Sequence, residues 1–344
     1  MLGGELAREA MFYKYDEQKK TVLCELCPHY CRLKEGQRGR CGVREHQECK
    51  LITLNYGECS SYALDPIEKK PLYHFYPGSQ IFSIGTLGCN FSCSFCQNWS
   101  IAQNCEADTI AVIPEDILEI METRVPKGQR LGVAYTYNEP TIWYEFVYDT
   151  AKLIHEKGMK NVLVTNGFIN REPLEKILPY IDAMNIDVKG FTDNFYRNYC
   201  GGRLNPVMET VEVAASQCHV EVTSLIIPTL NDSMEEIGQM VRWLAGISPD
   251  IPLHFSRYFP GCRLELYPTP VKTLEKAREL ARERLNYVYI GNVQDNDFSH
   301  TRCPGCGKVL IRRTGYMIKN EGLDGHTCKF CGEKLNFVSA GVMQ

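Results

Sequence analysis

The chain has 344 residues, of which 44% are hydrophobic, 10% aromatic and 23% charged. This is the composition of a globular protein with a full core, and it excludes disorder and fibrous repeats. No run approaches the ~18 apolar residues of a membrane helix, and the charged N-terminus lacks the apolar core of a signal peptide. We therefore expect a soluble cytoplasmic protein with no membrane partner. The net charge of −4 gives no global attraction for nucleic acid, although both ends are mildly basic and the body is acidic.

Residues 1–79 form a predicted N-terminal region that is rich in Cys, Gly and Arg and has little periodicity. Four cysteines follow one another there at C-x2-C-x3-C-x9-C: Cys24, Cys27, Cys31 and Cys41. Clustered thiols in a non-secreted chain indicate metal or redox chemistry more often than disulfides. The irregular spacing leaves two interpretations open. One is a second metal site, holding zinc or an auxiliary cluster, with His29 as an alternative ligand; the other is reduced cysteines that only pack.

Seven short apolar runs predict the strands of a core over residues 80–291, and several are continuous, as buried parallel strands are. They are Ile81–Thr86, Leu131–Tyr135, Asn161–Thr165, Ala183–Val188, Val220–Ile227, Leu253–Arg257 and Tyr287–Ile290. Amphipathic segments between them predict helices over Pro140–Lys157, Val207–Ser216, Ser233–Leu244 and Thr273–Leu285. We expect Gly158 to end the first helix, Asn205 to cap the second and Ser233 to open the third with a capping box. The alternation predicts an α/β fold with a parallel sheet, and seven strands suffice for a barrel or partial barrel.

Three cysteines follow the first of these strands at C-x3-C-x2-C: Cys89, Cys93 and Cys96. Three thiolates leave one iron of a four-iron cluster without a protein ligand, and an open position allows a metal centre to bind a substrate. The alternative is structural zinc completed by a distant Cys or His. The aromatic Phe95 before the third cysteine and the position at the mouth of an α/β core favour the cluster.

At these residues the sequence resembles the radical S-adenosylmethionine (SAM) superfamily. The resemblance implies a partial (β/α)6-type, TIM-like barrel, a 4Fe–4S cluster on the three cysteines, and SAM bound at the free iron. Phe95 matches the aromatic that the superfamily usually has before its third cysteine. In that superfamily one electron cleaves SAM and yields a 5′-deoxyadenosyl radical, so an external electron donor is an expected partner.

Polar motifs follow the next two strands, at the edge where parallel α/β folds bind ligands. Asn138 and Glu139 stand in the place of the superfamily's Gly-Gly-Glu-Pro element, whose backbone and Glu secure the methionine amino group. Because Tyr-Asn replaces Gly-Gly, a side chain enters the site here. Thr165 and Asn166 resemble a segment of the glycyl-radical-enzyme activases, in which an Asp stands at the position of Val164.

Asp187 and Lys189 follow the fourth strand, and the corresponding Asp and Lys of the activases lie near SAM. The resemblance implies that Lys189 pairs with the methionine carboxylate and that Asp187 holds Lys189 or a monovalent cation. A buried pair that serves only the fold is the alternative. At a later strand, His254 and Arg257 offer cationic groups to SAM or substrate, but their odd separation sends them to opposite faces, so one of them is not in the site.

Residues 292–344 form a predicted C-terminal module with two Cys-x-x-Cys-Gly units: Cys303, Cys306, Cys328 and Cys331. Two such units make a tetrahedral four-sulfur site, as in zinc ribbons and rubredoxins. Zinc is favoured over iron, and a structural role over an electron relay, because all four ligand positions are filled. The other cysteines are expected to be small buried hydrophobes: Cys49, Cys59, Cys105, Cys200, Cys218 and Cys262.

An ordered set of motifs over nearly the whole chain resembles the radical SAM member of the AmmeMemoRadiSam system, which is described as similar to pyruvate formate-lyase activating enzyme. The set comprises Leu26–His29, Asp65–His74, Gly88–Trp99, Tyr135–Pro140 and Cys303–Gly307. The resemblance implies Memo-type and AMMECR-type companion proteins. It leaves the substrate open between a glycine of a partner protein, RNA and a small molecule. A non-catalytic, metal-stapled scaffold that binds a partner is the alternative from another class.

Overall fold

A mixed sheet of eight strands forms the centre of the computed structural model, which describes residues 7–294 and 297–339. The strand order is β16-β15-β14-β13-β12-β11-β9-β8, in which β9 to β16 are parallel and β8 is antiparallel to β9. Their bounds are Ser61–Pro66 (β8), Gln80–Gly85 (β9), Gly132–Tyr135 (β11), Lys160–Thr165 (β12), Ala183–Asp187 (β13), His219–Ile226 (β14), Leu253–Arg257 (β15) and Val288–Gly291 (β16). All seven predicted strands are confirmed, and no boundary moves by more than one residue.

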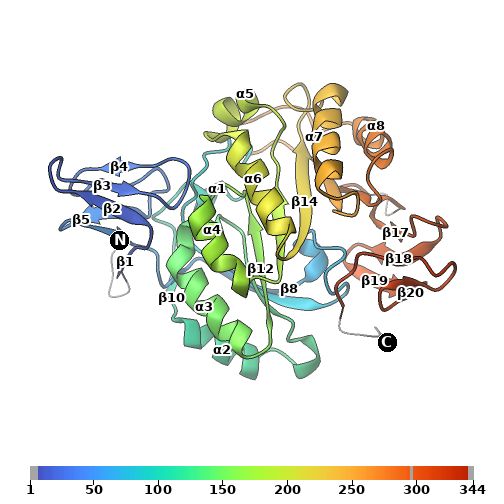
Figure 1. The fold of residues 1–344 in the computed structure, drawn as a ribbon, viewed down its shortest axis with the longest axis horizontal. Coiled ribbons are helices and arrows are strands. Elements are labelled where there is room, and N and C mark those ends of the chain that lie inside the picture. The colour runs from blue at the N-terminus through green and yellow to red at the C-terminus, as the bar shows by residue number, and fades with distance from the viewer. Residues whose placement is uncertain (1–6, 295–296, 340–344) are drawn as a thin grey trace.

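Helices lie between these strands along the chain. The longer ones are α2 (Pro114–Thr123), α3 (Tyr144–Glu156), α4 (Arg171–Ile177), α6 (Leu204–Ala215), α7 (Met234–Ile247) and α8 (Val271–Arg282), and short turns form α1 (Trp99–Ala102), α5 (Asp193–Phe195) and a π-helix (Tyr196–Cys200). In Figure 1, α3, α4, α6 and α7 lie side by side in front of the sheet. The buried face of α3 includes Phe146, Val147 and Ile154, and burial of each such side chain contributes about 1.5–3 kcal/mol.

The four predicted helices are confirmed, but two of their predicted N-terminal caps are wrong. Arg203, not Asn205, precedes α6, because the carboxylate of Asp193 accepts from Leu204 N and so takes the role of the cap. Ser233 does precede α7, but its side chain makes no capping hydrogen bond. Gly158 ends α3 as predicted, with a φ of 71° that favours glycine.

The N-terminal region forms two small antiparallel sheets at one end of the molecule (Figure 1). One joins β1 (Arg8–Glu9), β6 (Lys50–Thr53) and β5 (Arg44–Gln47), and the other joins β2 (Tyr13–Asp16), β3 (Thr21–Cys24) and β4 (Arg32–Leu33). Farther on, β7 (Glu58–Cys59) pairs with β10 (Ile110–Ala111). The region is tied to α3 by a buried ion pair of Arg44 and Glu145 at 2.6 Å. The strand β8, which precedes the boundary drawn at residue 79, belongs to the central sheet.

The C-terminal module lies at the opposite end of the molecule (Figure 1). Its strands are β17 (Thr301–Arg302), β18 (Val309–Thr314), β19 (Met317–Asn320), β20 (Leu323–Asp324) and β21 (Thr327–Cys328). Arg313 anchors it to the segment between β8 and β9, because its fully buried guanidinium donates to Tyr73 O at 2.8 Å and covers the Tyr73 ring. Among the described residues, no helix is both long and apolar enough to cross a bilayer.

Candidate active site

A cavity of about 580 Å³ opens where the parallel strands end. It receives side chains from the segments that follow β9, β11, β12 and β13, and also from Thr223 and Leu225 of β14 and Ser256 of β15. Ten of the residues predicted to bind the cluster or SAM line it: Cys89, Cys93, Phe95, Cys96, Asn138, Glu139, Thr165, Asn166, Asp187 and Lys189. Parallel strands bring their carboxyl ends to one edge, which is why positions so far apart in the sequence meet here.

His254 and Arg257 lie outside this cavity, which corrects the expectation that one of them faces it. His254 is buried on β15, with Nε2 2.7 Å from Glu221 Oε2 and its ring stacked on Tyr289. The guanidinium of Arg257 donates from Nε to Thr269 O at 2.8 Å. Strand alternation does separate the two side chains, but the residue of β15 that lines the cavity is Ser256, which lies between them.

The three thiols after β9 fit a multi-iron cluster better than a single ion. All three are free, and they are not all within 4.8 Å of one another, as the ligands of one ion would be. Each cysteine of a four-iron cluster binds a different iron, which separates the sulfurs. Cys89 Sγ also accepts from Phe91 N at 3.3 Å and from Asn166 Nδ2 at 3.7 Å, and such N–H···S bonds tune the potential of iron–sulfur centres.

Cys200 is a contact of the site that the sequence analysis missed. It is fully buried, as predicted for a packing cysteine. Its interaction with Cys93, followed by the positive charge of Lys189, lowers the pKa of Cys93. Burial raises the pKa of Cys96 to about 11. Cys93 is therefore the thiol of the three most readily deprotonated for metal binding.

Glu139 is held in place by a set of short hydrogen bonds at the inner end of the cavity. Its Oε1 accepts from Thr165 Oγ1 at 2.7 Å and from Thr141 N at 2.9 Å, and its Oε2 accepts from Asn166 N at 2.8 Å. The side chain is 1% exposed, and this burial raises the pKa of Glu139 despite the hydrogen bonds. The predicted site residues Thr165 and Asn166 thus orient the carboxylate.

The side chain of Asn138 clamps the cluster loop. Its Oδ1 accepts from Thr86 N at 3.1 Å, and its Nδ2 donates to Gly88 O at 2.8 Å, directly before the first cysteine. Both ends of the amide are therefore used within the protein. The neighbouring Tyr137 adopts a φ of 72°, a left-handed conformation that costs a non-glycine residue about 1–2 kcal/mol.

Asp187 and Lys189 form an ion pair at 2.6 Å on the β13 side of the cavity. Burial alone would lower the pKa of Lys189, but the charges of Asp187 and Cys93 outweigh it, so the pKa lies above its usual value. The lysine therefore stays protonated and provides a fixed positive charge beside the thiols. Its backbone is also fixed, because Asn231 Nδ2 donates to Lys189 O at 2.7 Å.

A second basic group also lines the cavity and was not predicted. Asp65 binds Lys69 at 2.8 Å and Lys70 at 2.7 Å, and both lysines line the cavity. Lys70 is 2% exposed and its ammonium also lies over the ring of Tyr137. Both lysines belong to the Asp65–His74 motif, which entered above only as part of a family resemblance. The two adjacent lysines shortly after Asp65-Pro66 are the signal in the sequence that could have indicated this basic group. Tyr316 of the C-terminal module also lines the cavity.

The N-terminal cysteines surround one small buried cavity, together with His29 and Arg44. Burial raises the pKa of Cys24, and that of Cys41 to about 12. In the part of the chain that the structure describes, these thiols do not form a single-ion group of three or more. A second metal site there stays a prediction.

The C-terminal cysteines do form such a group, with all four sulfurs within 4.8 Å of one another. Cys303 Sγ lies 3.6 Å from Cys331 Sγ, and Cys306 Sγ lies 3.8 Å from Cys328 Sγ. A tetrahedron with metal–sulfur bonds of ~2.3 Å has edges of ~3.8 Å. The four-sulfur site predicted from the Cys-x-x-Cys units is therefore present and has the size that one metal ion requires.

Comparison with known proteins agrees with this geometry. The model of the radical SAM superfamily matches residues 83–244, which include the three cysteines and the ends of β11, β12 and β13. An uncharacterized protein of Methanocaldococcus jannaschii is 47% identical over 341 residues, which cover 96% of this chain and 99% of that protein. The chain belongs to the radical SAM superfamily, and it is a radical SAM enzyme.

Two further relatives bear names of activating enzymes. A putative glycyl-radical enzyme activating enzyme of M. jannaschii is 25% identical over 211 residues, covering 59% of this chain and 77% of that protein. A pyruvate formate-lyase-activating enzyme of Clostridium pasteurianum is 28% identical over 168 residues, covering 46% of this chain and 67% of that protein. A solved domain of such an enzyme from Bacteroides vulgatus is 16% identical, with a TM-score of 0.41, and covers 46% of this chain and 98% of that one.

Proposed function

We propose that this enzyme cleaves SAM reductively and uses the 5′-deoxyadenosyl radical to abstract a hydrogen atom from a glycine of a partner protein. One observation carries the proposal: a single cavity brings together three free thiols, the carboxylate of Glu139 and the Asp187–Lys189 pair. A 4Fe–4S cluster on Cys89, Cys93 and Cys96, once reduced by an external donor, would supply the single electron that breaks the sulfonium C–S bond.

The residues of the chain itself would bind and orient SAM. Glu139 has a second lone pair on Oε2, so its fixed carboxylate can accept a hydrogen bond from the methionine ammonium. Lys189 stays protonated and can pair with the methionine carboxylate, while Asp187 holds the lysine in place. The products are methionine and, after hydrogen transfer, 5′-deoxyadenosine and a substrate radical, so one electron and one hydrogen atom are accounted for.

The choice of a protein substrate rests on two observations. The relatives with names that state a function are called activating enzymes. In the C-terminal module, all three arginines are used within the protein, since Arg302 pairs with Asp297, Arg312 pairs with Glu321 and Arg313 is fully buried. The remaining basic residues there are four exposed lysines. The use of the arginines within the protein favours a protein substrate over RNA.

Four finer predictions belong to the same proposal. They are the curvature of the sheet into a partial (β/α)6 barrel, zinc as the ion at the C-terminal cysteines, membership of the AmmeMemoRadiSam system, and Memo-type and AMMECR-type companions. The spacing of the four C-terminal sulfurs supports a tetrahedral site for one ion, and zinc is the ion that we propose for it. The companions are the first candidates for the partner protein.

The test begins with anaerobic reconstitution by iron and sulfide, followed by SAM and dithionite, with 5′-deoxyadenosine as the readout. We expect product from the wild type and from Cys218→Ala, a partly buried cysteine that does not line the cavity, and none from Cys93→Ala. SAM cleavage by Cys93→Ala would contradict the ligand assignment. The substrate is tested by adding each companion protein labelled with α-deuterated glycine. Deuterium in 5′-deoxyadenosine supports a glycine substrate, and unlabelled product alone contradicts it for that companion.

A further inference from the structure

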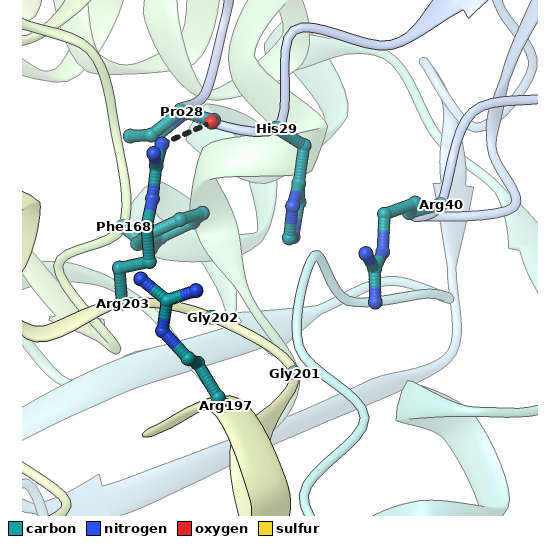
Figure 2. A pocket seen from close by; sticks show the side chains of 8 residues that line it. All are labelled: Pro28, His29, Arg40, Phe168, Arg197, Gly201, Gly202 and Arg203. Carbon is teal, nitrogen blue, oxygen red and sulfur yellow. Dashed lines mark hydrogen bonds between the residues drawn. The ribbon is translucent and has the colours of Figure 1, made fainter. Parts of the chain in front are cut away.

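A second pocket, of about 340 Å³, lies between the N-terminal region and the core and shares no lining residue with the active-site cavity. Figure 2 shows side chains that reach it from three segments. The N-terminal region provides Pro28, His29 and Arg40, and the turn after β12 provides Phe168. The π-helix and the segment that leads from it to α6 provide the rest: Arg197, Gly201, Gly202 and Arg203.

The lining of this pocket carries three guanidinium groups and no carboxylate. Arg197 donates to Asp193 from Nε and one terminal nitrogen, which leaves the other terminal nitrogen unused within the described residues. Arg203 is fixed by a 2.7 Å bond to Pro28 O, drawn as the dashed line in Figure 2. The guanidinium of Arg40 makes no hydrogen bond or ion pair with any described residue. All three arginines are exposed, and Arg197 is paired with Asp193, so their unused N–H donors, more than their mutual repulsion, are what the pocket offers to an anion.

His29 adds a fourth polar group and is partly buried. Its Nε2 donates to Asn90 O at 2.7 Å, since a carbonyl oxygen only accepts, so Nδ1 is available to a ligand. The ring is held against Phe168 with centroids 4.9 Å apart.

The floor of the pocket is the Gly201–Gly202 backbone, which packs directly against the cluster loop. A Cβ on Gly202 would lie 2.3 Å from the ring of Phe91, and one on Gly201 would lie 2.8 Å from Ser92 Oγ. Ser92 N also donates to Cys200 O at 2.8 Å. Both glycines therefore allow a close approach that no other residue permits, and the floor is rigid.

We propose that this pocket binds the phosphate or diphosphate group of a small molecule. Guanidinium groups bind phosphate oxygens through paired hydrogen bonds. Three of them line this pocket, Arg40 from the N-terminal region and the other two from the π-helix and the residues that follow it. The pocket volume of about 340 Å³ lies near the lower end of the range of small-molecule sites, roughly 300–1,000 Å³. Apart from Phe168 and Pro28 the lining is polar, which suits a compact anionic group rather than an apolar ligand. The proposal does not depend on the reaction at the neighbouring cavity.

The test is calorimetric titration of the complete protein with pyrophosphate at low chloride concentration. The variant is Arg40→Gln/Arg197→Gln, which leaves the Arg203 anchor intact. The matched control is Arg282→Gln/Arg284→Gln, which removes the same charge from exposed positions at the end of α8. Orthophosphate and citrate are titrated in parallel. Orthophosphate shows whether one phosphate group is enough for binding, and citrate shows whether the pocket prefers phosphate to carboxylate. Thermal melting verifies that each variant is folded.

We expect one pyrophosphate per chain, with a Kd that rises at least ~10-fold in Arg40→Gln/Arg197→Gln and is unchanged in the control, since each lost charge-assisted bond alone accounts for such a factor. Absence of binding by the wild type overturns the proposal. Equal binding by the variant and the control also overturns it, because the sites would then be elsewhere. Citrate binding as tight as that of pyrophosphate overturns the assignment to phosphate.

Discussion

The phenol of Tyr137 donates a 2.8 Å hydrogen bond to Asp65 Oδ2, the oxygen that also binds the ammonium of Lys70 at 2.7 Å. Tyr137 stands where the superfamily has a glycine, and its left-handed backbone is the conformation that glycine adopts freely. The contact with Asp65 offsets part of that conformational cost. It also links the element after β11 to the two lysines that Asp65 binds.

Replacement of Tyr137 by Phe removes this hydrogen bond and keeps the ring under Lys70. We expect the free energy of unfolding to fall by about 1 kcal/mol, and 5′-deoxyadenosine formation at low SAM concentration to fall by up to ~10-fold, as a comparable loss of binding energy would produce. Tyr62→Phe is the control, because Tyr62 lies on β8 and is 61% exposed. Equal effects of the two changes would contradict the role of the phenol.

Cys200→Ala tests the hydrogen bond to Cys93. The three cluster ligands remain, so iron and sulfide content should be unchanged. A hydrogen bond to a cluster sulfur stabilises the reduced state, and a bond of about 1 kcal/mol corresponds to ~40 mV for one electron. We therefore expect the midpoint potential, measured by anaerobic titration, to become more negative by that order. A potential equal to that of Cys218→Ala would show that the contact has no electronic effect.

Cys306→Ala tests the C-terminal metal site. Because a structural metal contributes its binding energy to folding, we expect loss of about one zinc per chain and a lower melting temperature. Cys93→Ala should give the reverse pattern, with zinc retained and cluster iron lost. Metal analysis by mass spectrometry and thermal melting on the same samples separate the two sites. Iron instead of zinc in the wild-type module would contradict the assignment of the ion.

Arg44→Met tests the attachment of the N-terminal region. Arg44 is 1% and Glu145 3% exposed, and removal of one partner leaves the other charge buried, which costs about 3–5 kcal/mol. Arg38→Met is the control, since Arg38 pairs with Glu45 at a more exposed position and such pairs contribute about 0–1 kcal/mol. The free energy of unfolding, measured with a chemical denaturant, should fall by more in Arg44→Met than in Arg38→Met. In Arg44→Met/Glu145→Leu much of the lost stability should return, because neither charge remains.

The histidine at position 74 predicts a dependence of stability on pH. Burial is the main reason that the pKa of His74 is lowered to about 3, with Glu221, His219 and Arg313 as the charged groups that face it. An unfolded chain protonates this histidine below its usual pKa of 6.5, whereas the folded chain does not until the pH nears 3. Acidification between these values therefore favours the unfolded state, by about 1.4 kcal/mol per pH unit.

His74→Gln should remove this part of the slope, although the variant is less stable at neutral pH. The measurement is the free energy of unfolding of the wild type and the variant at several values between pH 7 and the onset of acid unfolding. His155→Gln, an exposed change at the end of α3, should keep the slope of the wild type. A parallel decline of all three proteins would show that His74 is protonated in the folded state.

The sequence predicted the site best where a residue able to bind a metal or SAM comes soon after a parallel strand. Cys89, Glu139 and Lys189 each follow a parallel strand, so a single rule about sheet edges brought them to one cavity. The same rule did not reveal what Asn138 does, since its amide is consumed by Thr86 and Gly88, two contacts across the chain that no local pattern encodes.

Long-range packing explains the other differences. Cys200 and Lys70 were missed because a π-helix and a short segment before β9 fold back on the core and so bring Cys200 to Cys93 and Lys70 to the cavity. The alternation of side chains along β15 predicts that His254 and Arg257 point to opposite faces. It does not show that Ser256 is the residue of β15 that faces the cavity. His254 is buried against Glu221 and Tyr289, and these contacts hold its side chain away from the cavity.

The attachment of the C-terminal module has an evolutionary consequence. Arg313 is fully buried against Tyr73, and Tyr316 from the same module reaches the active-site cavity. A shortened gene that ended before Cys303 would expose a charged pocket on the core and remove one side of the place where the substrate binds. Loss of the module would therefore change both the core and the active-site cavity, whereas exchange of its ion would leave the contacts of Arg313 and Tyr316 in place.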